Sequence, residues 1–169
     1  MTPAISSLDL GKPRGAALGV AIVAAATISG ALIFQSIGYA PCELCLEQRY
    51  AYYAGIPLAL IAALLASSQP TLARILLFMV TALFLFNAGF GVFHSGVEWG
   101  WWPGPAGCSS PGGGATMGQA GSLLQQMQAT RAVNCSEAAL RILGLSLAGW
   151  SAIICAAMAA VAFNAARKG

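Results

Sequence analysis

Four long runs of mostly apolar residues, each free of charged side chains, organise this sequence. They cover residues 15–42, 50–73, 75–97 and 142–166 and contain 28, 24, 23 and 25 residues. Crossing about 30 Å of hydrocarbon takes about 20 helical residues, and no run shows the periodicity of a half-buried soluble helix. The pattern predicts one all-α integral membrane domain over 1–169, a bundle of four transmembrane helices. We expect the spans at about 16–38, 49–67, 73–94 and 143–164.

The first run follows Lys12 and Arg14, as the apolar part of a signal peptide would. It is longer than such a segment and has no clear small-x-small cleavage site. We therefore interpret it as a retained first helix.

Two connections lie on the side opposite the termini, at about 39–48 and 95–142. The second is long and rich in glycine and proline. Within it, 119–130 places Leu123, Leu124 and Met127 on one side among glutamines, which predicts a short helix on the membrane surface.

The composition agrees with a membrane protein, because 58% of the residues are hydrophobic and 8% are charged. Soluble domains average about 25% charged residues. A net charge of +3 from eight basic and five acidic residues is too small for a nucleic-acid-binding face, so nucleic acid is not expected as a partner.

The basic residues predict the orientation. Five lie on the side of the two termini: Lys12, Arg14, Arg74, Arg167 and Lys168. Three are spread over the longer segments of the other side: Arg49, Arg131 and Arg141. The positive-inside rule then places both termini in the cytoplasm. For a bacterial inner membrane, the two connections would be periplasmic.

Four of the five cysteines fall in these connections. They are Cys42 and Cys45 in the first and Cys108 and Cys135 in the second, whereas Cys155 lies within the last span. Outside the cytoplasm, disulfides form and persist. We interpret Cys155 as a small apolar packing residue.

The C-x-x-C pair Cys42 and Cys45 has three interpretations. A structural disulfide would close a very small loop and add little stability. A zinc site would need further ligands, which Cys108 and Cys135 offer as part of a four-cysteine set. A redox-active pair is favoured by the position of Cys45, where the second helix should begin and where the helix dipole stabilises a thiolate.

Arg49 lies one helical turn after Cys45 and is the cation nearest to it in sequence. A guanidinium at the membrane boundary can stabilise a thiolate or an oxyanion, although an arginine that only extends toward the headgroups is the alternative. Cys108 and Cys135 fit either a disulfide that ties down the loop or a mobile redox pair.

Three segments together resemble the DsbB-type disulfide-forming membrane proteins of bacteria. They are Pro41-Cys-Glu-Leu-Cys-Leu-Glu-Gln-Arg49, His94-Ser-Gly-Val-Glu-Trp99, and Cys135-Ser-Glu137 followed by Leu143-Gly-Leu-Ser-Leu-Ala-Gly-Trp150. The resemblance runs from about residue 16 to 165. The sequence departs from the family pattern at Leu140, where relatives commonly have Trp.

The resemblance implies a thiol:quinone oxidoreductase. A reduced periplasmic thioredoxin-like oxidase of the DsbA type would attack Cys108, and the freed Cys135 would attack Cys42. Cys45 would then pass electrons to ubiquinone or menaquinone, with Arg49 stabilising the anion. A non-catalytic protein with a four-cysteine metal site or purely structural disulfides is the alternative. Quinone reductases of the vitamin K epoxide type also use a C-x-x-C in a four-helix frame.

His94 and Glu98 stand at i and i+4 at the end of the third run. They are candidates to hydrogen-bond a quinone carbonyl or to relay the protons that quinone reduction takes up. A simple His–Glu pair at the membrane boundary is the alternative.

Overall fold

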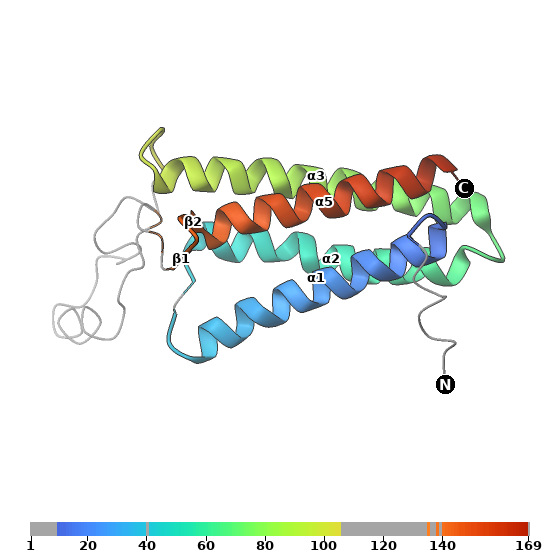
Figure 1. Cartoon of the computed structure of the whole chain (residues 1–169), viewed down its shortest axis with the longest axis horizontal. Helices are drawn as coiled ribbons and strands as arrows, with labels where there is room; N and C mark the ends of the chain where they lie inside the picture. The colour runs from blue at the N-terminus through green and yellow to red at the C-terminus, as the bar shows by residue number, and fades with distance from the viewer. Residues whose placement is uncertain (1–9, 40, 106–134, 136–137, 139, 169) are drawn as a thin grey trace, which may run out of the picture.

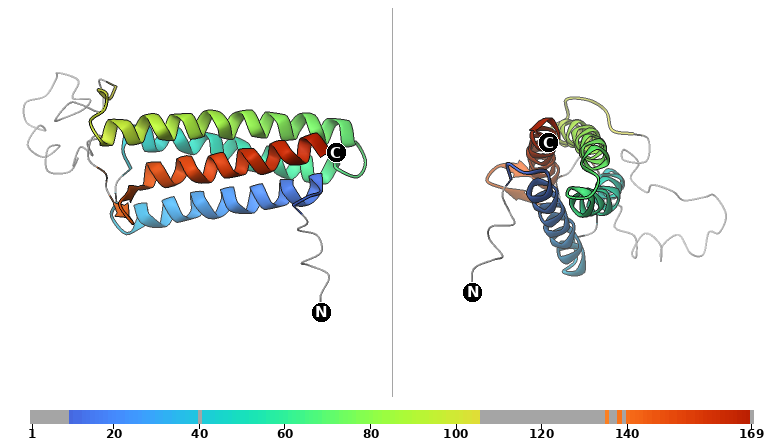
Figure 2. Two further views of the ribbon diagram at one scale, coloured as in Figure 1. Left: turned by 45° about the horizontal axis from the view of Figure 1, so that its top comes forward. Right: turned by 90° about the vertical axis from the view of Figure 1, so that its right-hand side faces the viewer.

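The computed structural model describes residues 10–39, 41–105, 135, 138 and 140–168, and this part of the chain forms a helical bundle (Figure 1). Its elements are α1 (Pro13–Ser36), α2 (Glu43–Leu65), α3 (Pro70–Glu98), β1 (Arg141–Ile142), β2 (Leu145–Ser146) and α5 (Leu147–Lys168). The four helices run side by side, and α1 begins at the end of the bundle where α5 finishes (Figure 2). The predicted all-helical bundle is confirmed for these residues.

Local chemistry explains where the helices begin. Pro13 and Pro70 stand in the first turn of α1 and α3, where a missing backbone N–H breaks no helical hydrogen bond. Ser146 precedes α5, and its Oγ accepts a hydrogen bond from the N–H of Gly149 at 3.2 Å. Such a cap satisfies one of the unpaired donors of the first helical turn.

Small residues let the helices approach closely, and the most extensive contact joins α3 to α5. At Gly91, an added Cβ would lie 2.9 Å from the Cβ of Ala152 and 3.2 Å from the carbonyl oxygen of Ala148. At Gly55 it would lie 2.6 Å from Phe84, whose side chain is fully buried. Membrane helices pack through such small residues because lipid offers no hydrophobic drive for helix association.

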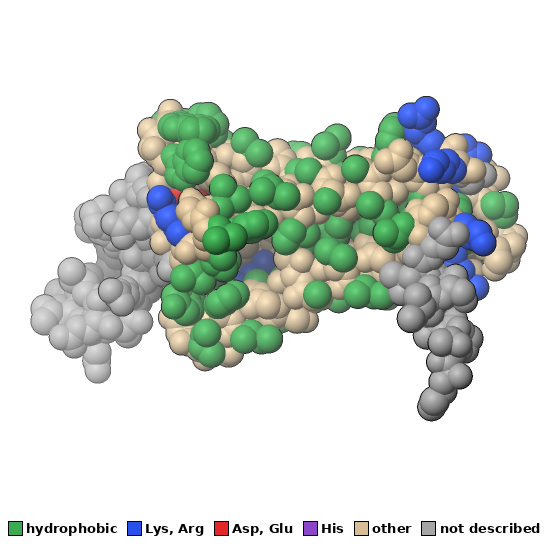
Figure 3. All heavy atoms as spheres, in the orientation of Figure 1, with side chains coloured by type: hydrophobic (Ala, Val, Ile, Leu, Met, Phe, Trp, Pro, Cys, Tyr) green, Lys and Arg blue, Asp and Glu red, His purple; other side chains and the backbone are tan. Residues whose placement is uncertain are grey.

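The outside of the bundle is apolar along its length, while most of the Lys and Arg side chains visible in Figure 3 gather where α3 begins and α5 ends. Three helices in the described part of the chain, α1, α3 and α5, are long and apolar enough to cross a membrane. The polar and charged residues at the start of α2, among them Glu43, Glu47 and Arg49, lower its hydropathy. Four spans therefore remain a prediction.

The structure differs from the sequence pattern before the last helix. Residues 141–146 form an antiparallel hairpin, with Arg141 opposite Ser146 and Ile142 opposite Leu145, where the charge-free run predicted a span from about 143. Leu143 and Gly144 both have positive φ, 54° and 82°, as tight hairpin turns require. The predicted surface helix at 119–130 lies outside the described residues.

Candidate functional site

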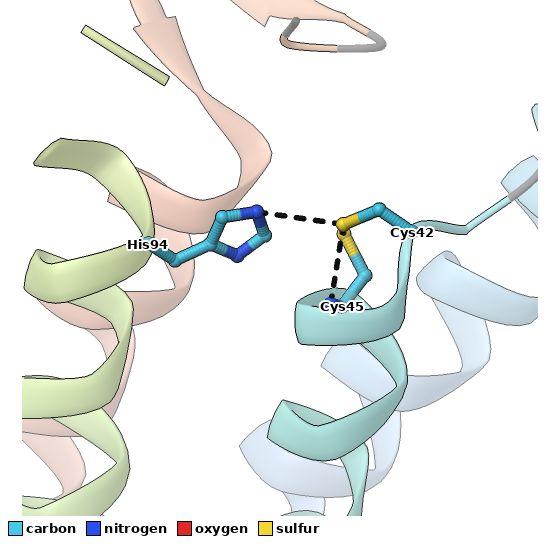
Figure 4. A group of neighbouring side chains, drawn as sticks. All are labelled: Cys42, Cys45 and His94. Atoms are coloured by element: carbon cyan, nitrogen blue, oxygen red, sulfur yellow. Dashed lines mark hydrogen bonds between the residues drawn. The ribbon is translucent and has the colours of Figure 1, made fainter. Parts of the chain in front are cut away.

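Cys42 and Cys45 face each other across the first turn of α2 (Figure 4). The helix begins at Glu43 rather than at Cys45, so Cys42 is its N-cap residue and Cys45 lies within its first turn. The backbone N–H of Cys45 donates to Sγ of Cys42 at 3.3 Å. The two sulfur atoms are 2.7 Å apart, so this backbone holds them ready for disulfide exchange.

Hydrogen bonding makes the two cysteines unequal in acidity. Cys42 donates to Cys45, and this bond lowers the pKa of Cys45, with a smaller lowering from the Arg49 guanidinium. The same bond, together with burial, raises the pKa of Cys42. Both residues precede the predicted span that begins at about 49. Cys45 is therefore the more acidic thiol of the pair.

His94 reaches the pair from α3. Its Nε2 lies 3.4 Å from Sγ of Cys42 and 3.8 Å from Oε1 of Glu98, and its side chain is 1% exposed. The predicted i, i+4 pair of His94 and Glu98 is therefore in contact and beside the C-x-x-C. Figure 4 shows the imidazole pointing at Cys42.

A cavity of about 290 Å³ opens beside Cys45. Among the described residues its lining comes from α1, α2 and α5, from Tyr39, Pro41 and Cys42 before α2, and from Glu98 at the end of α3. Arg49 lines it, and Nη1 of this residue donates to Oε1 of Gln35 at 2.7 Å. The apolar lining includes Ala26, Ile28, Ala31, Phe34, Leu147, Ala148, Trp150 and Ile154.

Two buried polar atoms of the lining residues lack a hydrogen-bond partner in the described structure: Nε2 of Gln48 and Oε2 of Glu98. Gln48 is 6% exposed, and a buried donor without a partner costs free energy. A bound acceptor in the cavity would remove that cost. Sequence reasoning missed Gln48, although its position three residues after Cys45 places both on one face of α2.

Cys135 joins the same end of the bundle. It is 2% exposed and belongs to a packed cluster with Cys42, Leu44 and Val97. Cys135 is disulfide-bonded, whereas Cys42, Cys45 and Cys155 are free thiols. The structure thus brings together three of the four predicted redox cysteines, and Cys108 lies outside the described residues.

Cys42, Cys45 and His94 also form a potential metal-binding group, because their ligand atoms lie within 4.8 Å of one another. This set differs from the predicted four-cysteine alternative, since Cys135 is held in a disulfide and offers no thiolate. A tetrahedral zinc site would need a fourth ligand.

Cys155 is more than the apolar packing residue that the sequence predicted. It is fully buried in the core, but Nδ2 of Asn87 donates to its sulfur at 3.3 Å and the Tyr52 hydroxyl lies 3.2 Å away. Asn87 and Tyr52 come from different helices, α3 and α2, so sequence spacing carries no sign of this contact.

Comparison with known families matches residues 13–165 to the family described as Disulfide bond formation protein DsbB. The match covers nearly all of the 169 residues. Comparisons with curated proteins and with solved structures gave no match.

Proposed function

This chain belongs to the DsbB family of disulfide-forming membrane oxidoreductases, and from that premise we propose that it oxidises a periplasmic thioredoxin-like dithiol protein of the DsbA type and reduces a membrane quinone. The observation that carries the proposal is the cavity beside Cys45, which combines an apolar wall with the donors of Arg49 and Gln48. A site with this lining suits a flat apolar ring that bears oxygen acceptors.

The residues of the cavity fit a quinone. The unpartnered Nε2 of Gln48 and the guanidinium of Arg49 are both donors, and a quinone presents carbonyl acceptors. When bound, the quinone accepts two electrons and two protons. Arg49 and Gln48 would hold a carbonyl oxygen beside Cys45, and the apolar residues of α1 would exclude water.

The disulfide of Cys135 supports a thiol–disulfide exchange step at the end of the bundle that holds Cys42 and Cys45. We assign its partner as Cys108, because the other three cysteines are free thiols. The reduced partner protein would attack Cys108, which breaks the Cys108–Cys135 bond and frees the Cys135 thiolate. Cys135 packs in one cluster with Cys42, so it can attack that sulfur once Cys42 and Cys45 are joined.

The electrons balance over the cycle. Two partner thiols become one disulfide, and Cys108 with Cys135 and then Cys42 with Cys45 each pass through a dithiol state. Oxidation of Cys42 and Cys45 back to a disulfide delivers two electrons and two protons to the quinone. Nε2 of His94 lies 3.4 Å from Sγ of Cys42, so His94 would take part in moving the proton that Cys42 releases.

The test mixes the purified full chain, a reduced dithiol partner and a short-chain quinone, and follows quinone absorbance. We expect turnover that Cys45→Ser abolishes, because this change removes the thiolate beside the cavity. Full turnover in the Cys45→Ser variant would refute the role of Cys45.

The cluster of Cys42, Cys45 and His94 supports a second candidate, a metal-binding protein. Metal analysis of the purified protein distinguishes the oxidoreductase from the metal-binding protein. Stoichiometric zinc that resists removal, with Cys42 and Cys45 unreactive toward alkylating reagents, would favour the metal site over thiol exchange.

A further inference from the structure

We propose that a hydrogen-bonded chain from Asn87 through Cys155 and Tyr52 to Ser151 presents a hydroxyl donor to the quinone from the inner wall of the cavity. This inference rests on the proposed function and adds a further polar contact to the quinone site, deeper than Arg49 and Gln48.

This hydrogen-bonded chain joins three helices. Nδ2 of Asn87 on α3 donates to Sγ of Cys155 on α5 at 3.3 Å, and this sulfur lies 3.2 Å from the hydroxyl of Tyr52 on α2. The Tyr52 hydroxyl lies 2.9 Å from Oγ of Ser151. Asn87, Tyr52 and Cys155 are 3%, 3% and 0% exposed.

We infer one direction for this hydrogen-bonded chain, because the contacts of Tyr52 with Cys155 and with Ser151 allow either partner to donate. An amide NH2 can only donate, so the sulfur of Cys155 accepts from Asn87, and in the inferred direction its S–H donates to Tyr52. The Tyr52 hydroxyl can then donate to Ser151. This leaves the hydroxyl hydrogen of Ser151 for a group beyond the chain.

The hydrogen-bonded chain ends at the cavity, not in the core. Tyr52 and Ser151 both line it, together with Cys45 and Arg49. Ser151 follows Leu147 by one turn of α5, and Tyr52 follows Gln48 by one turn of α2, so both lie farther from the C-x-x-C along the bundle. Hydrogen bonds that only hold helices together can be completed inside the core. This network instead ends at a residue that lines the cavity.

Packing holds Tyr52 in place. Its ring meets Phe84 edge-on, with centroids 5.7 Å apart, and Phe84 occupies the space left by Gly55. The fixed Tyr52 hydroxyl in turn orients the Ser151 hydroxyl that it contacts. A preorganised donor lowers the entropic cost of binding the quinone. Its chemistry suits an oxygen of the quinone ring, either the second carbonyl or a methoxy group.

The experiment measures quinone affinity without turnover. In the Cys45→Ser background of the full chain, a short-chain ubiquinone is titrated and tryptophan fluorescence is followed, because Trp150 lines the cavity. We expect Ser151→Ala and Tyr52→Phe each to weaken binding about 3- to 10-fold, the effect of one lost hydrogen bond. Cys155→Ala should weaken quinone binding to a similar extent. Cys155→Ser, which keeps a donor and an acceptor, should bind quinone as the parent does.

Thr81→Val is the matched control, because it also removes a hydroxyl from a membrane helix but one bonded to its own helix at Leu77. Thr81→Val should bind quinone like the parent. Parental affinity in both Ser151→Ala and Tyr52→Phe would overturn the inference while leaving the proposed function intact. Failure of the parent itself to bind quinone would instead overturn the proposed function.

Discussion

At the scale of single residues, the chemistry depends on which sulfur of the C-x-x-C holds the negative charge. Cys45 accepts a hydrogen bond from Cys42 and lies near Arg49, and both effects lower its pKa. The thiolate is the reactive form in exchange. Both residues line the cavity, and the lower pKa makes Cys45 the more reactive thiol of the two.

This charge predicts a pH profile for alkylation. A lowered pKa keeps Cys45 as a thiolate at pH values where an ordinary thiol, with a pKa near about 8.5, is protonated. In reduced protein we expect the midpoint for iodoacetamide labelling of Cys45 to lie below that of an ordinary thiol, measured by mass spectrometry across pH. Cys42→Ala removes the donor and should move that midpoint upward; an unchanged midpoint would contradict the assigned hydrogen bond.

Arg49 gives the second prediction at this scale. Arg49→Ala should raise the apparent KM for quinone by at least about tenfold, the effect of losing a charge-assisted hydrogen bond. Steady-state quinone reduction measures it. Gln35→Ala serves as the control, because it only releases the guanidinium from its bond to Gln35, and it should change KM by less than about threefold. Equal effects of the two changes would mean that Arg49 acts by bridging α1 and α2.

Residues close in sequence were the ones that sequence reasoning could place. Cys42, Cys45 and Arg49 share the start of one helix, and His94 and Glu98 share one helical turn, so spacing alone predicted both groups. The contact of His94 with Cys42 needs the packing of α3 on α2. That packing cannot be predicted from sequence spacing. Gln48 does share a face of α2 with Cys45, but only the structure shows that its side chain is buried beside the cavity.

At the scale of helices and strands, the pattern of charges located the bundle but not its ends. The last charge-free run, 142–166, takes in all of the hairpin 141–146 except Arg141, because the turn at Leu143 and Gly144 precedes α5 without introducing a charge. Gly144 was a sequence signal for this turn, because glycine is the residue that most readily adopts positive φ. The cap at Cys42 likewise depends on backbone geometry that a hydropathy pattern does not contain.

The contact between α3 and α5 gives a prediction from two glycines on the same helix. Gly91→Ala places a methyl group against Ala152 and the backbone of Ala148, and such overpacking costs about 1–3 kcal/mol. We expect the unfolding midpoint in detergent to fall by about 2–12 °C. At Gly89 an added Cβ meets no atom within 4 Å among the described residues. Gly89→Ala should therefore leave the midpoint unchanged or raise it, and equal losses at both positions would contradict this packing.

At the scale of the whole molecule, the proposed function requires the C-x-x-C to face the compartment of the proposed partner. The start of α3 and the end of α5 lie at one end of the bundle, and Nε of Arg74 donates to the carbonyl oxygen of Ala166 at 3.1 Å across them. The C-x-x-C lies at the opposite end, where α2 begins. The positive-inside rule predicts that the end with Arg74, Arg167 and Lys168 is cytoplasmic.

This orientation can be tested with reporter fusions at the C-terminus of the full chain. A fluorescent protein that matures only in the cytoplasm should fluoresce there, and alkaline phosphatase, which needs an oxidising compartment to form its disulfides, should stay inactive. The paired control labels intact spheroplasts with a membrane-impermeant maleimide after mild reduction, which should modify Cys45. An active phosphatase fusion together with protected Cys45 would place the thiols in the reducing cytoplasm. There the dithiol state would already be the stable one, and an oxidative relay to quinone would have no periplasmic partner to serve.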